Sequence, residues 1–390
     1  MLNKNNTGSV IYFDNAATTF PKPPEVAEAM LHYIRDIGAN PGRSGHKLAI
    51  AAGQTVFAGR RTLAEFFHLK NPMHVIFTGN ATDALNMAIR GVLQTGDHAI
   101  TSSMEHNSTI RPLHRMQKDG IIDLSIVQAD SGGLLDPQDV RKAMNSKTKA
   151  VIINHVSNVN GCIQPIREIG KICRERGIIF IVDAAQSAGI FPISMQEDFI
   201  DLLGMPGHKS LYGPTGSGAL LIADDFDPKK IHPLKCGGTG SLSDSIEQPD
   251  FLPDMLESGT LNVAGIAGFT AGVQAIQKID SIQNHKQKLQ SYFLARAENE
   301  IPNFRHFTHP NLPAAGVISF ILEKFSVSEV AQILSDKYNI MCRQGLHCAP
   351  LAHKTLGTFP DGTLRFGFSI FNTKEEIDTA IEALKSIAHG

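Results

Sequence analysis

The sequence has few cysteines, no excess of charge of either sign and no long hydrophobic run. Five cysteines are scattered over 390 residues, which favours free thiols in a reducing compartment over a disulfide framework. The 36 Lys and Arg residues nearly balance the 38 Asp and Glu residues, whereas a nucleic-acid-binding protein usually has a basic excess. The most apolar stretch, residues 178–185, contains Asp183 and is too short to cross a membrane.

The sequence also lacks low-complexity tracts and any repeat of about 20–50 residues. Residues 1–6 contain no apolar segment of the kind found in signal peptides. Hydrophobic residues make up 42% and charged residues 19%, a composition typical of a globular protein with a large core. We therefore expect a cytoplasmic protein of two or three domains that binds neither nucleic acid nor a membrane.

Between about residues 74 and 222, short β-branched runs alternate with amphipathic helical patterns. The predicted strands lie at residues 74–77, 98–100, 123–127, 150–153, 178–182 and 218–222. Two of the helical patterns cover residues 81–93 and 165–176, the second with Pro165 suited to its first turn. This alternation predicts an α/β fold with a mostly parallel sheet covered by helices.

After residue 262 the pattern changes to that of a smaller α+β domain. The predicted elements are a long helix from Val263 to about Asn299, strands at 316–321 and 363–368, and helices at 326–337 and 373–388. Capping boxes at residues 326–329 and 373–376 open the last two helices. We expect a large domain of residues 16–260 and a small domain of residues 1–15 and 261–390.

Ligands of open α/β sheets bind beyond the carboxyl ends of the strands, and polar residues follow several predicted strands here. Residues 79–84 open a helix, whose free amides and Thr82 hydroxyl could bind a phosphate; a simple helix cap is the alternative. Asp183 ends the most apolar strand, where a buried carboxylate needs a cationic partner such as a protonated pyridine nitrogen. Asp183 could instead cap a following helix.

Two further strand ends carry candidate ligands. His106 could lie flat on an aromatic ring, although Asn107 or Ser108 could simply cap the next helix. Residues 155–158 follow the strand that ends at Asn154 and add polar groups at the same edge.

Lys209 lies in a Gly-rich segment that suits a lysine reacting with a carbonyl cofactor. A Lys amine can form a Schiff base, and its reactivity depends on its environment. A solvated lysine in a flexible turn is the ordinary alternative. Residues 207–210 are not a nucleotide-binding P-loop, because that motif needs Gly directly before Lys and another Gly five residues earlier.

Cys348 lies in a loop punctuated by Gly345 and Pro350, where a thiol is more exposed than in a core. We expect nearby His347 and Arg343 to favour its thiolate. A buried inert thiol is an alternative that suits Cys342 better. A zinc site would use Cys342, His347, Cys348 and His353, but their spacing matches no standard zinc motif.

Arg365 is placed in the middle of a predicted strand of the small domain. A guanidinium suits the bidentate binding of a carboxylate. A structural ion pair is an equal alternative on the sequence alone.

Taken together and in this chain order, these motifs resemble those of class V, fold-type I pyridoxal-phosphate enzymes, and among them the cysteine desulfurases. The resemblance runs from residues 12–19 (YFDNAATT) to residues 371–373 (FNT), nearly the whole chain. Residues 343–348 (RQGLHC) are similar to the short, group II form of the Cys loop. The resemblance implies a mostly parallel seven-stranded sheet flanked by helices, a smaller α+β C-terminal domain, and a homodimer.

The resemblance also implies the roles of individual residues toward pyridoxal 5′-phosphate. Lys209 carries the cofactor as a Schiff base, His106 stacks on its ring, and Cys348 takes up sulfur. Asp183 pairs with the pyridine nitrogen and Gln186 reaches the ring hydroxyl. The residues implied to hold the phosphate are Ala81, Thr82, His208 and, from the second subunit, Thr260. The residues implied at the substrate are Asn158, Arg365, His46 and Ala16.

Three positions depart from the family pattern. Pro206 and Ala81 stand where many relatives carry hydroxyl residues, so two hydroxyl groups at the phosphate are missing, which bears on cofactor retention. Leu346 replaces a polar residue that is common in the Cys loop.

The implied reaction converts L-cysteine to L-alanine and transfers sulfur to Cys348 as a persulfide, which then passes to an acceptor protein. L-selenocysteine is an alternative substrate. Two other classes of function stay open: the same scaffold acting as a selenocysteine lyase, C–S β-lyase or aminotransferase, and a non-enzymatic phosphate-binding module. Cys348 discriminates the desulfurase from the first of these classes, because β-elimination and transamination need no thiol. A colourless purified protein without the visible absorbance of the bound cofactor would favour the second class.

Overall fold

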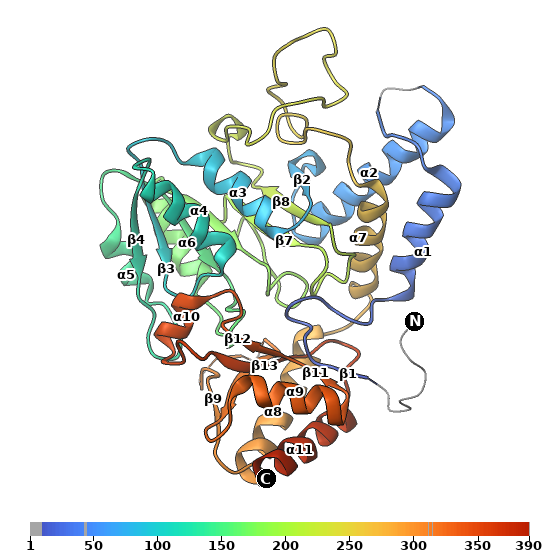
Figure 1. Ribbon diagram of the computed structural model, residues 1–390. Helices are drawn as coiled ribbons and strands as arrows, with labels where there is room; N and C mark the ends of the chain where they lie inside the picture. Colours follow the sequence, from blue (N-terminus) through green and yellow to red (C-terminus); the bar gives the residue numbers. More distant parts are fainter. Residues whose placement is uncertain (1–9, 43–44, 311, 314, 390) are drawn as a thin grey trace.

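The computed structural model describes residues 10–42, 45–310, 312–313 and 315–389 (Figure 1). Residues 1–9 and 390 of the expected small domain lie outside the described residues, and so does the prediction about a signal peptide, which rests on residues 1–6. So do Arg43 and Ser44, which shortly precede His46.

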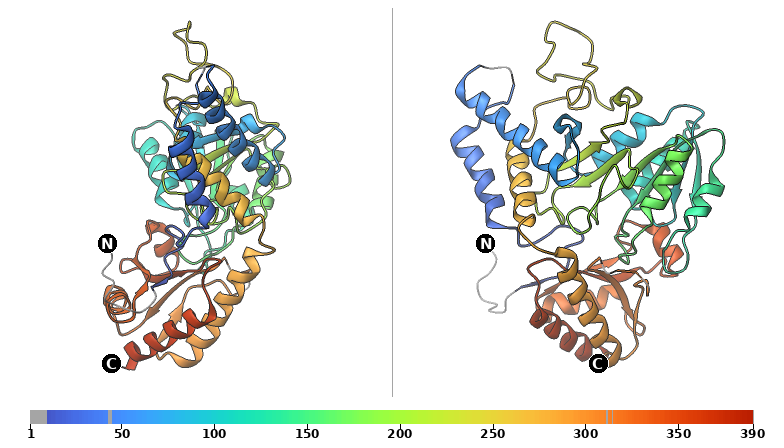
Figure 2. Two further views of the ribbon diagram at one scale, coloured as in Figure 1. Left: turned by 90° about the vertical axis from the view of Figure 1, so that its right-hand side faces the viewer. Right: turned by 180° about the vertical axis from the view of Figure 1, so that it is seen from behind.

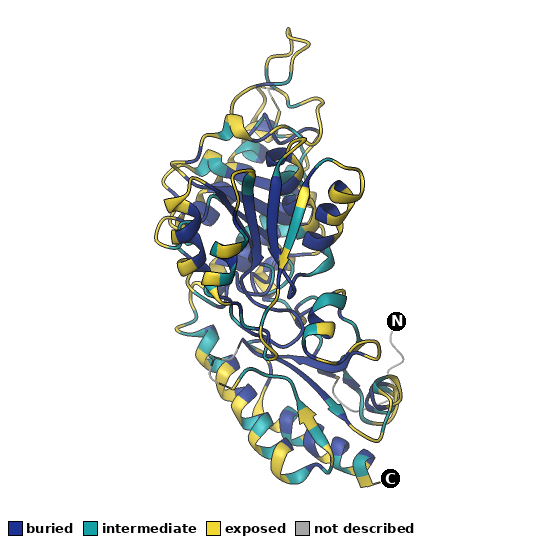
Figure 3. Cartoon of the chain, turned by 90° about the vertical axis from the view of Figure 1, so that its left-hand side faces the viewer, coloured by how far each residue is buried: buried dark blue, intermediate teal, exposed yellow. Residues whose placement is uncertain are grey.

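A seven-stranded, mostly parallel sheet forms the centre of the larger lobe, as predicted. Its strands are, in spatial order, β2 (Val75–Thr78), β8 (Gly218–Ile222), β7 (Leu202–Pro206), β6 (Ile179–Asp183), β5 (Thr148–Asn154), β3 (His98–Ser102) and β4 (Asp123–Val127). β8 runs antiparallel to both of its neighbours, and the other pairs are parallel. The inner strands are rich in Ile, Val and Leu and almost wholly buried, as Figure 3 shows.

The sequence pattern missed one of these strands, β7. Its five residues are all buried, but they include Gly204 and Pro206, two residue types that are unusual inside a strand. A Cβ at Gly204 would lie 3.1 Å from the Leu85 side chain, so the small residue lets the helix after β2 pack closely on the sheet. The missed strand is the one that leads to Lys209.

Helices cover this sheet and supply the rest of its core. They are α1 (Pro24–His32), α2 (Lys47–Phe66), α3 (Ala81–Val92), α4 (Asn107–Lys118), α5 (Pro137–Ala143), α6 (Ile166–Glu175) and α7 (Val263–Ile276). α3 shows why they form: Leu85 and Ile89 lie four residues apart on its buried face, and Asn80 caps its first turn by accepting from the Asp83 amide (2.9 Å). Within the described part of the chain, no helix has both the length and the apolar composition needed to cross a membrane.

The smaller lobe lies below the large one in Figures 1 and 2 and carries the C-terminal part of the chain. Its antiparallel sheet has the order β12 (Arg343–Gly345), β13 (Thr363–Gly367), β10 (Val317–Leu322) and β9 (Phe304–His306), and β1 (Ile11–Tyr12) pairs with β11 (Ile340–Met341). The helices are α8 (Ile282–Glu300), α9 (Val327–Tyr338), α10 (Pro350–Thr355) and α11 (Lys374–His389). The capping box at residues 373–376 forms in full: Thr373 accepts from the Glu376 amide (3.3 Å), and the Glu376 side chain accepts from the Thr373 amide (3.1 Å). At residues 326–329, Ser326 accepts from the Glu329 amide (3.2 Å).

The prediction of one long helix from Val263 to Asn299 is wrong. The chain forms two helices, α7 and α8, with a break at residues 277–281. Ser281 is extended (φ −161°) and its hydroxyl accepts from the Asn284 amide (3.1 Å), so it caps a new helix. The break turns α8 away from α7 and into the smaller lobe (Figure 2).

The buried apolar side chains form two large clusters that divide the chain close to this break. Val263, Phe269 and Ile276 of α7 belong to the cluster under the seven-stranded sheet. Leu289 of α8 belongs to the cluster of the smaller lobe, together with Phe13 from the N-terminal segment. The domain boundary at residue 260 stays a prediction, although the packing of α7 favours a division between α7 and α8.

Candidate active site

The predicted site residues gather at one edge of the seven-stranded sheet. β2, β3, β5, β6 and β7 all run in the same direction, so their carboxyl ends lie side by side. β6 ends at Asp183, and the chain reaches Lys209 just after β7 and His106 just after β3. Asp183 and His106 both lie close enough to Lys209 for their charges to interact.

Lys209 lies in a tight turn that depends on a glycine. A Cβ at Gly207 would lie 2.3 Å from Ser217 Oγ, so no other residue fits without a shift. The backbone oxygen of His208 accepts hydrogen bonds from the Thr19 amide (3.1 Å) and from Lys22 Nζ (3.2 Å). The N-terminal segment therefore fixes the turn that presents Lys209.

The electrostatic setting makes Lys209 a reactive amine. Burial is the largest influence and, together with the positive charges of Arg365 and Arg343, lowers the pKa of Lys209 to about 8, while the negative charge of Asp183 acts in the opposite direction. With this pKa, far more of the amine is neutral between pH 7 and 8 than in an ordinary lysine. Neutral lysine is the form that attacks a carbonyl carbon.

Asp183 is a buried acid that faces Lys209. Burial raises the pKa of Asp183, whereas hydrogen bonds and Lys209 act in the opposite direction. Asp183 Oδ1 accepts from the Ala185 amide (2.8 Å), a turn contact that leaves Oδ2 with only a long contact to Ser108 Oγ (3.5 Å). A cationic N–H in front of Asp183 would give the carboxylate the partner that burial demands.

His106 is itself the N-terminal cap of α4, so the alternative that Asn107 or Ser108 caps this helix is wrong. Its Nδ1 accepts from the Ser108 amide (3.0 Å). Burial, and then the nearby positive charges led by Lys209, lower the pKa of His106 to about 3. The ring is therefore a neutral imidazole in the physiological range, suited to contact a flat aromatic ligand.

The first turn of α3 and the Lys209 turn meet at a possible phosphate site. The amides of Ala81 and Thr82 have no partner within the helix, because they belong to its first turn. A Cβ at Gly218 would lie 2.8 Å from the backbone of Asn80, so the segment after Lys209 touches this helix start. His208 Nδ1 is buried without a hydrogen-bond partner among the described residues.

Gln186 and Ala16 lie next to each other beside this site. Gln186 Nε2 donates to the backbone oxygen of Ala16 (2.8 Å), and both residues are buried. The segment that carries Ala16 therefore closes the site on the side of the smaller lobe.

Arg365 is wholly buried and points from β13 into the same region. Its Nη1 donates to the backbone oxygen of Asn158 (3.0 Å) and its Nη2 to Asp14 Oδ1 (3.0 Å). Among the described residues, Arg365 Nε and Asn158 Oδ1 are buried without partners. The free N–H of the guanidinium is available to an anion. Asp14 is a further site residue. In the sequence it stands only within residues 12–19, and it was missed because it does not follow a predicted strand of the larger sheet.

Cys348 is exposed at the mouth of the site. Arg343 Nη2 donates to its sulfur (3.4 Å), and the Asn107 amide donates to its backbone oxygen (2.8 Å). Cys342 is more enclosed, and burial raises its pKa to about 12, as expected of an inert thiol. Cys348 is therefore the accessible thiol of this loop.

The expectation that His347 helps to form the Cys348 thiolate is wrong. The His347 ring is 2% exposed, and burial, with Arg365 next, holds its pKa well below the usual range. It is therefore uncharged and bonds to Thr363 Oγ1 (3.0 Å). Arg343 supplies the positive charge beside the sulfur.

The alternative of a zinc site receives no support from this geometry. His353 Nδ1 is bonded to Thr358 Oγ1 (2.7 Å), and its ring lies 5.4 Å from that of His347. Within the described ranges, no three His, Cys, Asp or Glu side chains gather as a metal site would require.

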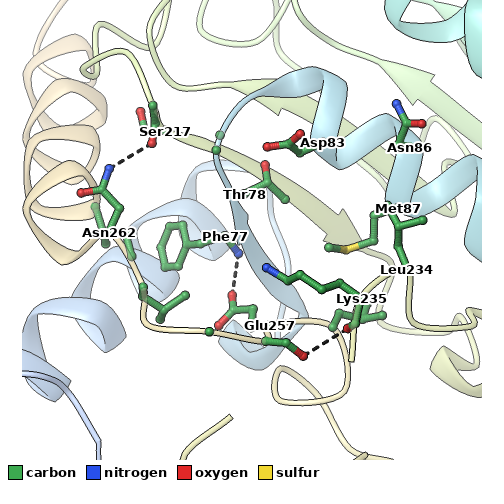
Figure 4. A pocket seen from close by; sticks show the side chains of 18 of the residues that line it. Phe77, Thr78, Asp83, Asn86, Met87, Ser217, Leu234, Lys235, Glu257 and Asn262 are labelled. Carbon is green, nitrogen blue, oxygen red and sulfur yellow. Dashed lines mark hydrogen bonds between the residues drawn. The ribbon is translucent and has the colours of Figure 1, made fainter. Parts of the chain in front are cut away.

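Thr260 belongs to the lining of a cavity of about 640 Å³ at the carboxyl end of β2 and the start of α3. Thr78, Ser217 and Glu257, which also line it, are labelled in Figure 4. Glu257 shapes its wall: it accepts from the Phe77 amide (2.6 Å) and pairs with buried Arg60. Thr260 itself is exposed, so its assignment to the site of a second subunit stays a prediction.

His46 caps α2, where its Nδ1 accepts from the Ala49 amide (3.2 Å). It is exposed, and its role near the substrate also stays a prediction.

Glu105 is a second buried acid that sequence reasoning passed over. Its Oε1 accepts from Ser102 Oγ (2.6 Å) and from the Asn154 amide (3.1 Å). Burial raises the pKa of Glu105 to about 8, and nearby Asp183 contributes to the rise. At neutral pH Glu105 is thus mostly protonated.

Comparisons with known proteins agree with this geometry. The family model described as Aminotransferase class-V matches residues 11–380, so the chain belongs to that family. Curated relatives include a protein named probable cysteine desulfurase from Methanothermobacter thermautotrophicus, 33% identical over 97% of this chain and 94% of the relative. Another with the same name, from Pyrococcus abyssi, is 35% identical over 98% of this chain and 95% of the relative.

Solved structures give the same answer. An apo cysteine desulfurase from Thermococcus onnurineus has a TM-score of 0.90 and 33% identity, covering 98% of this chain and 95% of that one. A cysteine desulfurase from Escherichia coli has a TM-score of 0.85 and 26% identity, covering 97% of this chain and 94% of that one.

The family implies pyridoxal 5′-phosphate as the cofactor, and the site fits this group. The cofactor has an aldehyde, a basic ring nitrogen and a phosphate. The site offers a reactive amine at Lys209, a buried acid at Asp183 and a free helix start at α3. The partnerless nitrogen of His208 lies in the same turn as Lys209.

Proposed function

We propose that this protein is a cysteine desulfurase that converts L-cysteine to L-alanine and receives the sulfur on Cys348 as a persulfide. The observation that carries the proposal is an exposed thiol, Cys348, bonded to Arg343 at the mouth of a site that also holds the buried pair Lys209 and Asp183. The names of the relatives and of the solved structures support the same reaction.

The cofactor-binding roles proposed are those implied by the resemblance to class V enzymes, and the gathering of these residues at one edge of the sheet supports them. Lys209 would bind the aldehyde carbon, Asp183 the ring nitrogen and Gln186 the ring hydroxyl, with the neutral ring of His106 against the cofactor ring. The groups for the phosphate are Ala81, Thr82 and His208, and in a homodimer Thr260 of the second subunit. When bound, pyridoxal 5′-phosphate supplies a conjugated ring that takes up the electrons of the broken Cα–H bond.

The protein's own residues then orient the substrate and move its protons. Arg365 binds the substrate carboxylate through its free N–H, and Asn158 helps to position it, with Ala16 and His46 nearby. Lys209, with a pKa of about 8, removes the proton from Cα and later returns a proton to the carbon skeleton. Fixing both ends of the substrate selects which bond breaks.

Sulfur transfer needs no further reactant. The Cys348 thiolate attacks the sulfur of the substrate, an S–S bond forms, and the Cβ–S bond breaks with its electron pair left on the carbon side. Protonation of that carbon gives L-alanine. The balance is one L-cysteine and one thiol giving one L-alanine and one persulfide, with the sulfur then passed to an acceptor protein.

A homodimer agrees with the exposed apolar surface of the larger lobe. Three apolar side chains are about half exposed or more: Leu31 of α1, Ile34 of the turn that follows α1, and Phe57 of α2. This density of apolar side chains is unusual for a free surface. Location in the cytoplasm stays a prediction of the composition.

The test is to load the protein with pyridoxal 5′-phosphate, add L-cysteine, and measure alanine and sulfane sulfur. Cys348→Ala is expected to keep the cofactor absorbance and lose both products. Cys236→Ala, which removes the other exposed thiol, is the matched control and is expected to behave as the parent protein. Full turnover in Cys348→Ala would favour a β-lyase or aminotransferase instead. Faster release of alanine from L-selenocysteine than from L-cysteine would identify a selenocysteine lyase.

A further inference from the structure

His347 is buried although it belongs to the loop that exposes Cys348. The His347 ring is 2% exposed, whereas its neighbour in sequence is open to solvent. Both residues have left-handed backbone angles, φ +47° for His347 and +59° for Cys348. Residues with side chains adopt this conformation at an energetic cost, so other contacts must hold the turn.

A chain of three hydrogen bonds holds it. His347 Nε2 lies 3.0 Å from Thr363 Oγ1, the Thr363 hydroxyl lies 2.9 Å from Ser319 Oγ, and Ser319 Oγ lies 2.6 Å from the backbone oxygen of Val159. All the side chains that take part in these three hydrogen bonds are buried. The chain crosses from the Cys348 loop through β13 and β10 to the loop after β5.

The chain runs in one direction. The carbonyl oxygen of Val159 can only accept, so the Ser319 hydroxyl donates to it. Ser319 Oγ must then accept the proton of the Thr363 hydroxyl, which leaves Thr363 Oγ1 as an acceptor for His347. His347 therefore carries its proton on Nε2, and its Nδ1 is bare, without a partner among the described residues.

Burial, and next the positive charges around it, keep His347 in this neutral form. Adding a proton to Nδ1 would place a buried cation close to Arg365, Arg343 and His353. No acceptor for that second N–H exists within the described chain. His347 is thus a fixed hydrogen-bond donor and does not exchange protons at physiological pH.

The series of hydrogen bonds ends at Val159, where the substrate carboxylate would be held. Val159 follows Asn158, whose Nδ2 donates to the backbone oxygen of His347 (2.7 Å) and whose own backbone oxygen accepts from Arg365 (3.0 Å). His347 is therefore tied to this loop twice, once through its backbone and once through its imidazole.

We propose that His347 is a positioning residue, which holds Cys348 in line with the substrate by donating from Nε2 into this chain. The proposal rests on the role of Cys348 as sulfur acceptor. In this role His347 transfers no proton. The hydroxyl groups of Thr363 and Ser319 help to hold the Cys348 loop, because they continue the hydrogen bonds that start at His347.

The test compares two amides at position 347. A Gln amide nitrogen can reach the place of Nε2, whereas an Asn amide nitrogen is nearer that of Nδ1. We expect His347→Gln to keep kcat for alanine formation within about threefold, and His347→Asn to lose about tenfold with KM little changed, the cost of one buried hydrogen bond. Thr363→Val should repeat the loss, and Thr363→Ser should restore activity.

A second readout does not need turnover. In cofactor-loaded protein, alkylation of Cys348 by iodoacetamide, followed by peptide mass spectrometry, should slow several-fold in His347→Asn but not in His347→Gln. The physical reason is that a loosened turn takes the sulfur away from Arg343, the cation beside it. If His347→Asn does not fold, Ser319→Ala replaces it. The rate of alanine formation and the rate of Cys348 alkylation are then compared between Ser319→Ala and the parent, and both should fall in the variant.

Equal and large losses in His347→Gln and His347→Asn would overturn the proposal, because the imidazole itself would then be required. No loss in either variant would overturn it as well. Failure of the proposed function looks different: the parent protein would bind the cofactor and make no alanine, while the alkylation rates would still report on the chain.

Discussion

Asp14 and Arg365 form an ion pair between residues 351 positions apart in the sequence: Arg365 Nη2 lies 3.0 Å from Asp14 Oδ1, and the guanidinium is 1% exposed. Burial lowers the pKa of Arg365, and Asp14 is the strongest opposing influence. The segment before the large lobe thus compensates a buried cation that reaches in from the small lobe.

Asp14→Asn should therefore destabilise the protein. The guanidinium would stay buried with a neutral partner, at a cost of about 1–3 kcal/mol in the free energy of unfolding. Urea unfolding measures this. Asp36→Asn, which removes an exposed ion pair with Arg35, is the control and should leave the midpoint unchanged. Equal midpoints for both variants would mean that Asp14 does not compensate Arg365.

The rate of cofactor loading should follow the titration of Lys209. Only the neutral amine reacts with the aldehyde, and the pKa of Lys209 is about 8. The rate at which visible absorbance appears after pyridoxal 5′-phosphate is added should rise with pH and level off above about 8. A rate that keeps rising toward pH 10 would show an ordinary lysine at this position.

Glu105→Gln should gain stability over the parent as pH rises. Burial raises the pKa of Glu105 to about 8, above the ordinary value of 4.5 for the unfolded chain. The folded protein therefore holds a proton that the unfolded chain loses, and the parent loses stability between about pH 4.5 and 8. The Gln variant does not titrate there, so the difference in unfolding free energy should grow from pH 5 to pH 8.

Glu105→Ala is the contrasting variant. It leaves the donors Ser102 Oγ and Asn154 N without an acceptor in the core, at a cost of about 2–4 kcal/mol. A Gln variant as unstable as the Ala variant at pH 5 would contradict the assignment of a protonated acid.

Lys286→Met should stabilise the protein most at low pH. Lys286 is buried, its Nζ lies 3.3 Å from Ser210 Oγ, and burial lowers its pKa to about 7 from 10.5. The unfolded chain therefore binds a proton that the folded protein lacks between these values, so the parent gains stability as pH rises from about 7 to 10.5.

The methionine variant should show no such slope. Its advantage in urea unfolding, on the order of a few kcal/mol at pH 7, should shrink toward pH 10. Parallel curves for the parent and Lys286→Met would indicate that Lys286 is solvated.

The residues at strand ends could be predicted from the sequence because the topology of a parallel sheet decides where they meet. Asp183 ends a run of apolar, mostly β-branched residues that indicates a buried strand. Because the carboxyl ends of parallel strands lie at one edge of the sheet, Asp183 is expected near Lys209 and His106. β7 was missed because Gly204 and Pro206 interrupt the pattern.

Other features depend on contacts that no local pattern encodes. The break between α7 and α8 had a signal, the capping residue Ser281, but hydrophobic residues continue on both sides of it. The bond of Asp14 to Arg365 and the burial of His347 join segments that only the folded chain brings together. Local sequence suggested the opposite charge state for His347, since exposure was assumed for the whole loop.

A third, small apolar cluster joins Ala349, Ala352 and Leu356, which follow Cys348, to Met104 and Val159 of the larger lobe. With the Asn107 amide bonded to the backbone of Cys348, this seam clamps the loop from both sides. The loop is thus tied to the larger lobe both by apolar packing and by a backbone hydrogen bond. In the proposed reaction, an acceptor of the sulfur would meet Cys348 at this surface, beside the start of α4.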